Sequence, residues 1–250
     1  MTLTSENSPE HGRLIRKLES ISRLDPADRK ALGALPLRTR SVEAGVEVIA
    51  QGSSPTEACF VIEGWLCRYA LTIDGGRQIV SFHIPGDLPD RDSVHMPHLD
   101  HAIGSVSAAR VAFIPHADLI ALTQTHTNIA LAMWRDSVVD AGVFRQWLTG
   151  LGRRTARQRV AHLICEMATR LELLGLSDGD HFAFPVNQAQ LADALGLSAV
   201  HVNRMVQDLR IEGLITWKAS VMTIHDPAHL RAVAGFDPAY LDLKPMVRPH

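Results

Sequence analysis

The sequence predicts an α+β protein in which a strand-rich N-terminal part, a long helix and a C-terminal pair of short helices follow one another. Three observations carry this prediction. Alternating runs and glycines fill residues 37–116, apolar residues recur every three or four positions after Asn128, and Gly196 separates two amphipathic segments within residues 185–215. Of the 250 residues, 46% are hydrophobic, which suits two modest domains.

The first 36 residues are expected to form two helices. Leu14, Leu18 and Ile21 recur at helical spacing, and Asp25 followed by Pro26 is a typical start for a second, shorter helix. These helices precede the strand-rich part of the chain.

Residues 37–116 are expected to form a β-roll. The runs VEVIAQG, ACFVIEGWLCRYALTI and RQIVSFHI alternate as strands do, and Asp74-Gly75-Gly76 between the last two is a strong hairpin signal. The strand pattern ends after Phe113-Ile114-Pro115.

Residues 117–151 are expected to be helical, with one break near Thr125. A heptad-like apolar seam runs along the second part of this tract, through Trp134, Ser137, Ala141, Phe144, Leu148 and Leu151. The seam could pair with a second copy of the chain, or it could pack on the β-roll of its own chain. Gly150 and Gly152 are expected to interrupt the helix as a hinge.

Residues 152–226 are expected to form a second domain. It opens with a run of cations that could face phosphate, although we expect them to be solvated, at Arg153, Arg154, Arg157 and Arg159. Asn187 and Gln190 can cap one short helix, and Ser198 can cap the next, whose Val202, Val206 and Leu209 form an apolar stripe. Residues 217–224 have the length of a two-stranded hairpin, and no function is assigned to the tail, residues 227–250.

The stretch LADALGLSAVHVNRMVQDLRIEGLI resembles the winged helix-turn-helix of the Crp/Fnr superfamily of bacterial transcription regulators. QIVSFHIPGD resembles the segment before the ligand pocket of that family's cyclic-nucleotide-binding-like sensor domain. The resemblance implies a double-stranded β-helix as sensor, a long dimerisation helix, and a homodimer that binds a two-fold symmetric site in duplex DNA. It also implies RNA polymerase as a partner.

Base reading is expected from the outward face of the second short helix, at Val200, His201, Asn203 and Arg204. Arg204 matches the arginine that ends the family's recognition motif, and Val200 stands where many members carry a glutamate. We therefore predict a half-site with a thymine methyl near Val200. Phosphate contacts are expected from amides, a hydroxyl and a cation, at Asn187, Gln188, Gln190, Ser198 and Lys218.

The effector pocket departs from the cyclic-AMP-binding branch of the family. Gly86 is followed by Asp87, and Asp100-His101 stand where an arginine-containing pair would hold the cyclic phosphate. A buried phosphate without a cation is costly, so we predict an unknown small-molecule effector other than a cyclic nucleotide, with Gly86, Asp87, Asp100 and His101 as a weak pocket assignment.

Metal and haem are alternatives for this pocket. His83, His95, His98 and His101 lie close in sequence to Asp87, Asp90, Asp92 and Asp100, which together could ligate a divalent metal or haem iron. The spacing matches no metal motif, and we expect solvated loop histidines and no cofactor. An iron–sulfur cluster is not expected because Cys59, Cys67 and Cys165 are too few and scattered.

Other classes are less well supported. No apolar run reaches the roughly 18 residues of a membrane span, and no secretory signal opens the chain, so we expect a cytoplasmic protein. A net charge of −2 does not itself indicate nucleic-acid binding. A cupin-type metalloenzyme would need an HxH pair, which is absent, and no nucleophile–base pair indicates catalysis. A module that has lost DNA binding is disfavoured by Arg204 and the turn at Gly196.

Overall fold

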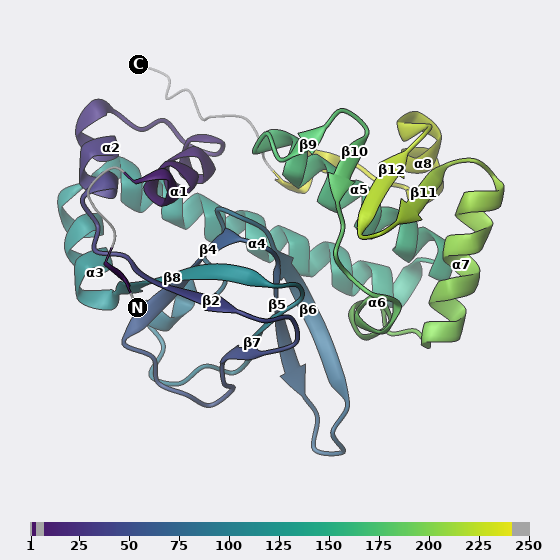
Figure 1. The fold of residues 1–250 in the computed structure, drawn as a ribbon, viewed down its shortest axis with the longest axis horizontal. Coiled ribbons are helices and arrows are strands. Elements are labelled where there is room, and N and C mark those ends of the chain that lie inside the picture. The colour runs from purple at the N-terminus through teal and green to yellow at the C-terminus, as the bar shows by residue number, and fades with distance from the viewer. Residues whose placement is uncertain (1, 4–7, 242–250) are drawn as a thin grey trace. The chain divides into compact units, whose positions relative to one another are not determined.

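The structure is a computed structural model that describes residues 2–3 and 8–241 (Figure 1). The described chain divides into two compact units, each treated separately below. The first holds the residues up to 138 except 76–80, and the second holds 76–80 and 139–241.

Two short helices open the first unit, as expected. They are α1 (Pro9–Glu19) and α2 (Pro26–Gly33). At the start of α2, the Asp25 carboxylate accepts from the Asp28 amide and the Asp28 carboxylate accepts from the Asp25 amide, both at 2.9 Å, which satisfies two free N–H groups. A short strand that the sequence did not indicate, β1 (Thr2–Leu3), pairs with β2.

Two four-stranded sheets form the β-roll, with strand orders β1-β2-β8-β4 and β3-β7-β5-β6. Their strands are β2 (Arg38–Val42), β3 (Glu47–Ile49), β4 (Glu57–Glu63), β5 (Leu66–Leu71), β6 (Arg77–His83), β7 (Ala102–Ser105) and β8 (Ala109–Pro115), with a 3₁₀ helix η1 (Arg91–Val94) before β7. The side chains of β4 alternate between two apolar clusters. Phe60 and Ile62 lie in the cluster that also contains residues of α1 and α2, whereas Cys59 and Val61 lie in a cluster formed mainly by strand residues. The predicted β-roll is therefore confirmed.

The long helix differs from expectation at its C-terminal end. After α3 (His116–Thr125), α4 (Thr127–Arg153) runs without interruption through Gly150 and Gly152. The predicted hinge at these glycines is wrong. Helix α4 ends at Arg153, and Thr155 is the N-cap of the next helix. The Thr155 hydroxyl accepts from the Gln158 backbone amide, and the Gln158 side chain accepts from the Thr155 backbone amide.

The second unit is built around α5 (Ala156–Leu173), which buries Val160, Leu163, Ile164 and Met167. Its other elements are β9 (Ser177–Asp178), β10 (His181–Ala183), α6 (Gln188–Leu195), α7 (Ala199–Ile211), β11 (Ile215–Lys218), β12 (Val221–Ile224), α8 (Pro227–Ala234) and the 3₁₀ helix η2 (Pro238–Leu241). The four strands form one small sheet, in the order β11-β12-β10-β9. None of the described helices is long and apolar enough to cross a membrane.

The tail contains structure that the sequence analysis missed. Helix α8 begins with Asp226 as N-cap and Pro227 in its first turn, and it packs against α5. Beyond it, the Tyr240 hydroxyl donates to the fully buried Glu166 carboxylate at 2.7 Å. Residues 227–241 therefore complete the core of the second unit.

Candidate nucleic-acid interface

Helices α6 and α7 form a helix-turn-helix whose ends are closed by local hydrogen bonds. The side-chain oxygen Oδ1 of Asn187 accepts from the Gln190 backbone amide, and the side-chain oxygen Oε1 of Gln190 accepts from the Asn187 backbone amide, both at 2.9 Å. Gly196 takes the left-handed conformation with φ +60° and ends α6, and the Ser198 hydroxyl accepts from the His201 amide at 3.2 Å.

The two faces of α7 differ as the sequence predicts. Val202, Val206 and Leu209 are buried. Val200 is 82% exposed, Arg204 is exposed, and His201 and Asn203 are half-buried on the outer side. The first turns of this helix therefore present one apolar side chain, one cation and two polar groups on the outer side, which suits insertion into a major groove.

The residues expected to contact phosphate fall into two groups. Asn187, Ser198 and Lys218 are exposed and Gln188 is half-buried. The prediction for Gln190 needs correction, because this residue is buried and its side-chain oxygen Oε1 accepts from the Asn187 backbone amide. Because the capping role turns this side chain inward, we withdraw Gln190 as a phosphate contact.

A two-residue turn joins β11 and β12 into a wing. Ala219 and Ser220 have φ values of +47° and +63°, the left-handed conformations that a tight hairpin of this length needs. The Ser220 carbonyl accepts from the Phe184 amide at 2.7 Å, and the Trp217 ring meets the Phe184 ring edge-on with centroids 5.5 Å apart. The wing is thus tied to the segment just before α6.

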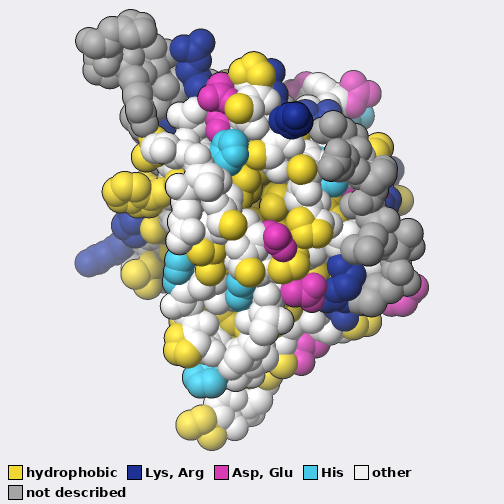
Figure 2. Space-filling model, turned by 90° about the vertical axis from the view of Figure 1, so that its left-hand side faces the viewer, with side chains coloured by type: hydrophobic (Ala, Val, Ile, Leu, Met, Phe, Trp, Pro, Cys, Tyr) yellow, Lys and Arg dark blue, Asp and Glu magenta, His cyan; other side chains and the backbone are white. Residues whose placement is uncertain are grey.

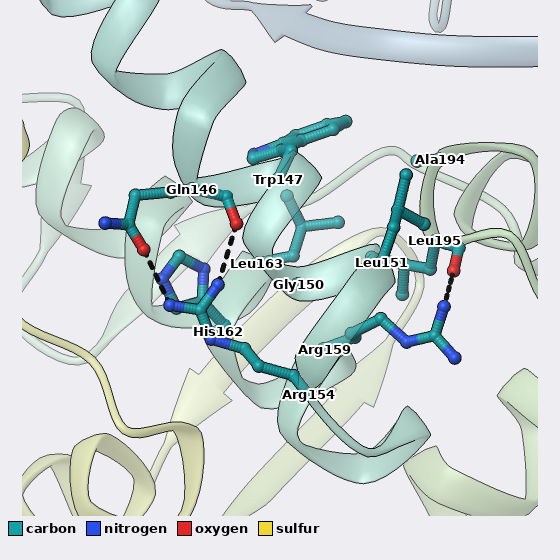
Figure 3. A pocket seen from close by; sticks show the side chains of 10 residues that line it. All are labelled: Gln146, Trp147, Gly150, Leu151, Arg154, Arg159, His162, Leu163, Ala194 and Leu195. Atoms are coloured by element: carbon teal, nitrogen blue, oxygen red, sulfur yellow. Dashed lines mark hydrogen bonds between the residues drawn. The ribbon is translucent and has the colours of Figure 1, made fainter.

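The cations after α4 are not simply solvated, contrary to expectation. Arg154 donates to the backbone oxygen and the side chain of Gln146, at 2.8 and 2.6 Å, and Arg159 donates to the Leu195 carbonyl at 2.5 Å (Figure 3). Arg157 pairs with Glu212. Arg159 therefore caps the last turn of α6. The sequence showed a run of charged residues but not the partners of those residues.

A narrow pocket lies behind the helix-turn-helix, and Figure 3 shows Trp147, Leu151 and Leu163 on its walls with His162 beside Arg154. A Cβ on Gly196 would lie 3.1 Å from a methyl group of Leu151, so α4 closely approaches the turn. Burial and the Arg154 charge lower the pKa of His162 to about 4, which keeps its imidazole neutral.

In the first unit, ion pairs engage Asp87, one of the two acidic residues of the expected effector pocket. The Asp87 carboxylate lies 2.8 Å from the Lys17 ammonium of α1, and Lys17 also lies 3.3 Å from Asp136 of α4. Arg91 of η1 pairs with Asp136 at 2.8 Å and donates to the Ser137 hydroxyl. Asp87 is therefore part of a buried network that joins α1, η1 and α4.

Asp100 and His101 form a separate pair, 2.7 Å apart. Burial lowers the pKa of His101, and the charge of nearby Arg68 lowers it further. Arg68 is itself buried and donates to the Pro89 carbonyl. The sequence analysis missed this cation, because it lies in an apolar strand, 33 positions before His101.

Of the loop histidines that we expected to be solvated, His95 and His98 are exposed, but His101 is buried. Ser81 is the hydrogen-bond partner of His83 and Ser54 that of His98, and Figure 2 shows histidine side chains spread singly over one face. Among residues 2–3 and 8–241, no group of three or more histidine, cysteine or acidic side chains could hold a metal ion. The three cysteines are buried in β4, β5 and α5.

Most of the seam residues on α4 carry exposed apolar area. Trp134 is 69% and Leu148 72% exposed, and Leu151 is also exposed, while Ala141 and Phe144 are half-buried. Ser137 is used by Arg91, and its neighbour Val138 is the exposed side chain at that level of the helix.

Two family models match the chain in sequence order: the cyclic nucleotide-binding domain over residues 39–126 and the Crp-like helix-turn-helix domain over residues 158–233. The chain belongs to the Crp/Fnr family of transcriptional regulators. As a Crp/Fnr-type regulator it carries a DNA-binding helix-turn-helix, and the relatives that it matches are transcriptional regulators.

Relatives of this Crp/Fnr protein cover most of its length. The nitrogen fixation regulation protein FixK of Bradyrhizobium diazoefficiens is 29% identical over 224 residues, covering 88% of this chain and 92% of FixK. The transcriptional activator protein FnrA of Stutzerimonas stutzeri is 26% identical over 216 residues, covering 85% and 86%. The structure of FixK2 from Bradyrhizobium japonicum shares the fold with a TM-score of 0.71, at 23% identity and covering 79% of this chain and 96% of that one.

Proposed function

We propose that this Crp/Fnr regulator binds a two-fold symmetric operator as a homodimer paired through α4, with residues 37–116 as sensor and 152–226 as DNA-binding domain. Val200, His201, Asn203 and Arg204 read bases, and Asn187, Gln188, Ser198 and Lys218 contact phosphates. The observation that carries the proposal is the outer face of α7, where Val200 and Arg204 are solvent-exposed above a buried apolar stripe.

The half-site preference follows from the side chains on that face. A guanidinium such as that of Arg204 can donate to both acceptors of a guanine. Val200 can accept no proton from a cytosine amine, but it can pack against a thymine methyl group. We therefore expect a half-site that differs from that of relatives carrying glutamate at this position.

The effector we propose is a small molecule other than a cyclic nucleotide, and RNA polymerase is the expected protein partner. Asp87 is committed to Lys17, and α1 closes over Gly86, whose Cβ would lie 3.2 Å from the Lys17 side chain. Asp100 adds a negative charge where a cyclic phosphate would need a cation, and the buried cation near His101, Arg68, already donates to the Pro89 carbonyl. Cyclic AMP is therefore expected to leave both the melting temperature and operator affinity unchanged.

The test is selection from random duplexes with the purified full-length protein, followed by binding titrations. We expect an inverted repeat, bound far more tightly than a scrambled duplex. In Val200→Glu, preference at one base pair of each half-site should move from thymine towards cytosine, a change of about 1–3 kcal/mol.

Ile211→Glu is the matched control, because it adds the same charge to another exposed position of α7. It should leave the preferred bases unchanged. An enriched site without two-fold symmetry, or the same preference in Val200→Glu as in the parent protein, would contradict the proposed reading.

A further inference from the structure

A groove of about 360 Å³ lies between the start of α6, the middle of α7 and the wing hairpin. Its polar lining consists of Asn187, Gln188, Gln207, Arg210, Lys218 and Ser220. Within the described part of the chain, no aspartate or glutamate lines it. The walls therefore combine two cations with three amides and a hydroxyl, without an opposing charge.

The groove is held in shape by backbone contacts. The hydrogen bond from the Phe184 amide to the Ser220 carbonyl fixes the tip of the wing beside the start of α6. Three register pairs between β10 and β12 continue this connection, and Trp217 packs edge-on against Phe184. These contacts fix the wing, and with it Lys218, relative to the start of α6.

Arg210 and Gln207 continue the polar side of the recognition helix towards the wing. Arg204, Gln207 and Arg210 follow at three-residue intervals, so they lie along neighbouring turns, and all three are exposed. Glu212, two positions after Arg210, is engaged by Arg157. The negative charge of Glu212 is thus largely balanced by Arg157 within the protein.

We propose that this groove receives the sugar–phosphate backbone of the DNA, with Arg210 as a direct phosphate contact and Gln207 as a neutral donor beside it. The inference rests on the proposed operator binding and adds two residues to the contacts assigned above. A groove with cations, amides and no carboxylate matches phosphate oxygens, which accept hydrogen bonds and carry the negative charge of the duplex.

The test measures operator binding of Arg210→Gln by fluorescence anisotropy over a range of salt concentrations. Losing one phosphate contact should lower the slope of log K against log salt by about 0.9 for each protein copy bound. We expect about 3- to 10-fold weaker binding at 0.1 M salt, with the ratio between operator and scrambled duplex unchanged. Gln207→Ala should weaken binding with no change in slope, because glutamine carries no charge.

Arg231→Gln is the matched control, since Arg231 is exposed on α8 and lies outside the groove. It removes the same charge and should leave the slope unchanged. Melting temperatures of all three variants should equal that of the parent protein, because the altered side chains lie at the surface.

Methylphosphonate substitution of the operator, one phosphate at a time, locates the contact. At one position per half-site the parent protein should lose affinity and Arg210→Gln should lose none. An unchanged slope in Arg210→Gln, or an equal decrease in Arg231→Gln, would overturn the assignment. A parent protein that does not distinguish its selected operator from the scramble would instead refute the proposed function.

Discussion

Asp90 is a fully buried carboxylate with an incomplete set of partners. One oxygen accepts from the Cys59 amide at 2.7 Å, and the other has no hydrogen-bond partner among the described residues. Burial raises the pKa of Asp90 from 3.8 to about 7, although the charge of Arg68 opposes this increase. The folded protein therefore holds a proton on Asp90 at a pH where the unfolded chain has released it.

This proton makes the stability of the fold depend on pH. Between pH 4 and 7 the folded state binds more protons at Asp90 than the unfolded state does. The contribution of Asp90 to the free energy of unfolding therefore falls as the pH rises, by up to about 4 kcal/mol. Asp90→Asn keeps a neutral acceptor for the Cys59 amide. We expect this variant to be less stable relative to the parent at pH 4 than at pH 8.

Urea unfolding of both proteins at a series of pH values checks this prediction. The difference between them isolates Asp90, because His162, whose lowered pKa destabilises the folded protein at acid pH, contributes equally to both. A difference that is constant from pH 4 to 8 would show that the burial of Asp90 does not govern its titration.

The end of α6 depends on a side chain from α5. Arg159 is a positioning residue, because it donates to the Leu195 carbonyl at the C-terminal end of α6, directly before the left-handed Gly196. A cation at this end of a helix also interacts favourably with the helix dipole. Its position within a run of arginines could easily suggest a phosphate contact instead.

Salt dependence distinguishes the two roles. Arg159→Met should lower the free energy of unfolding by about 1 kcal/mol and weaken operator binding a few-fold, because the helix-turn-helix is held less firmly. The slope of log K against log salt should stay unchanged, since no phosphate contact is lost. Arg153→Met, at the exposed end of α4, is the control expected to change neither quantity. A decreased slope in Arg159→Met would assign Arg159 to the DNA backbone.

The helix caps could be predicted from the sequence, whereas the long-range partners of the cations could not. The caps at Asp25, Asn187 and Ser198 were predictable because capping depends on residues within one helical turn. The partners of Lys17, Arg68 and Arg159 were not, because they lie 21 to 119 positions away along the chain and periodicity carries no information about them. The prediction from the glycines in α4 was wrong because helix propensity is a weak guide: the helix continues through both glycines, and Arg154 just after it donates back to Gln146.

At the scale of the whole molecule, the homodimer that we propose would depend on α4. Its exposed apolar side chains, Trp134, Val138, Leu148 and Leu151, are too many to leave in water on one helix of a monomeric protein without a role. Pairing with the same helix of a second copy would bury them and place two recognition helices on one duplex.

Light scattering of Leu148→Glu tests this pairing, because a buried, unpaired charge in the seam should separate the copies. We expect a mass near 55 kDa for the parent and near the chain mass of 27.4 kDa for the variant. Leu71→Glu, at an exposed position of β5, should keep the parent mass. A parent protein that elutes as a monomer at micromolar concentration would refute pairing through α4.

The buried cysteines have a practical consequence for studying the proposed DNA contacts. Burial raises the pKa of Cys59 and of Cys165, the latter to about 12, so almost no reactive thiolate is present at neutral pH, and Cys67 is also enclosed. A single cysteine introduced at the surface, for instance in place of Ser220 at the tip of the wing, can therefore carry a spectroscopic label without removing a native thiol. The natural chain is already a background for labelling.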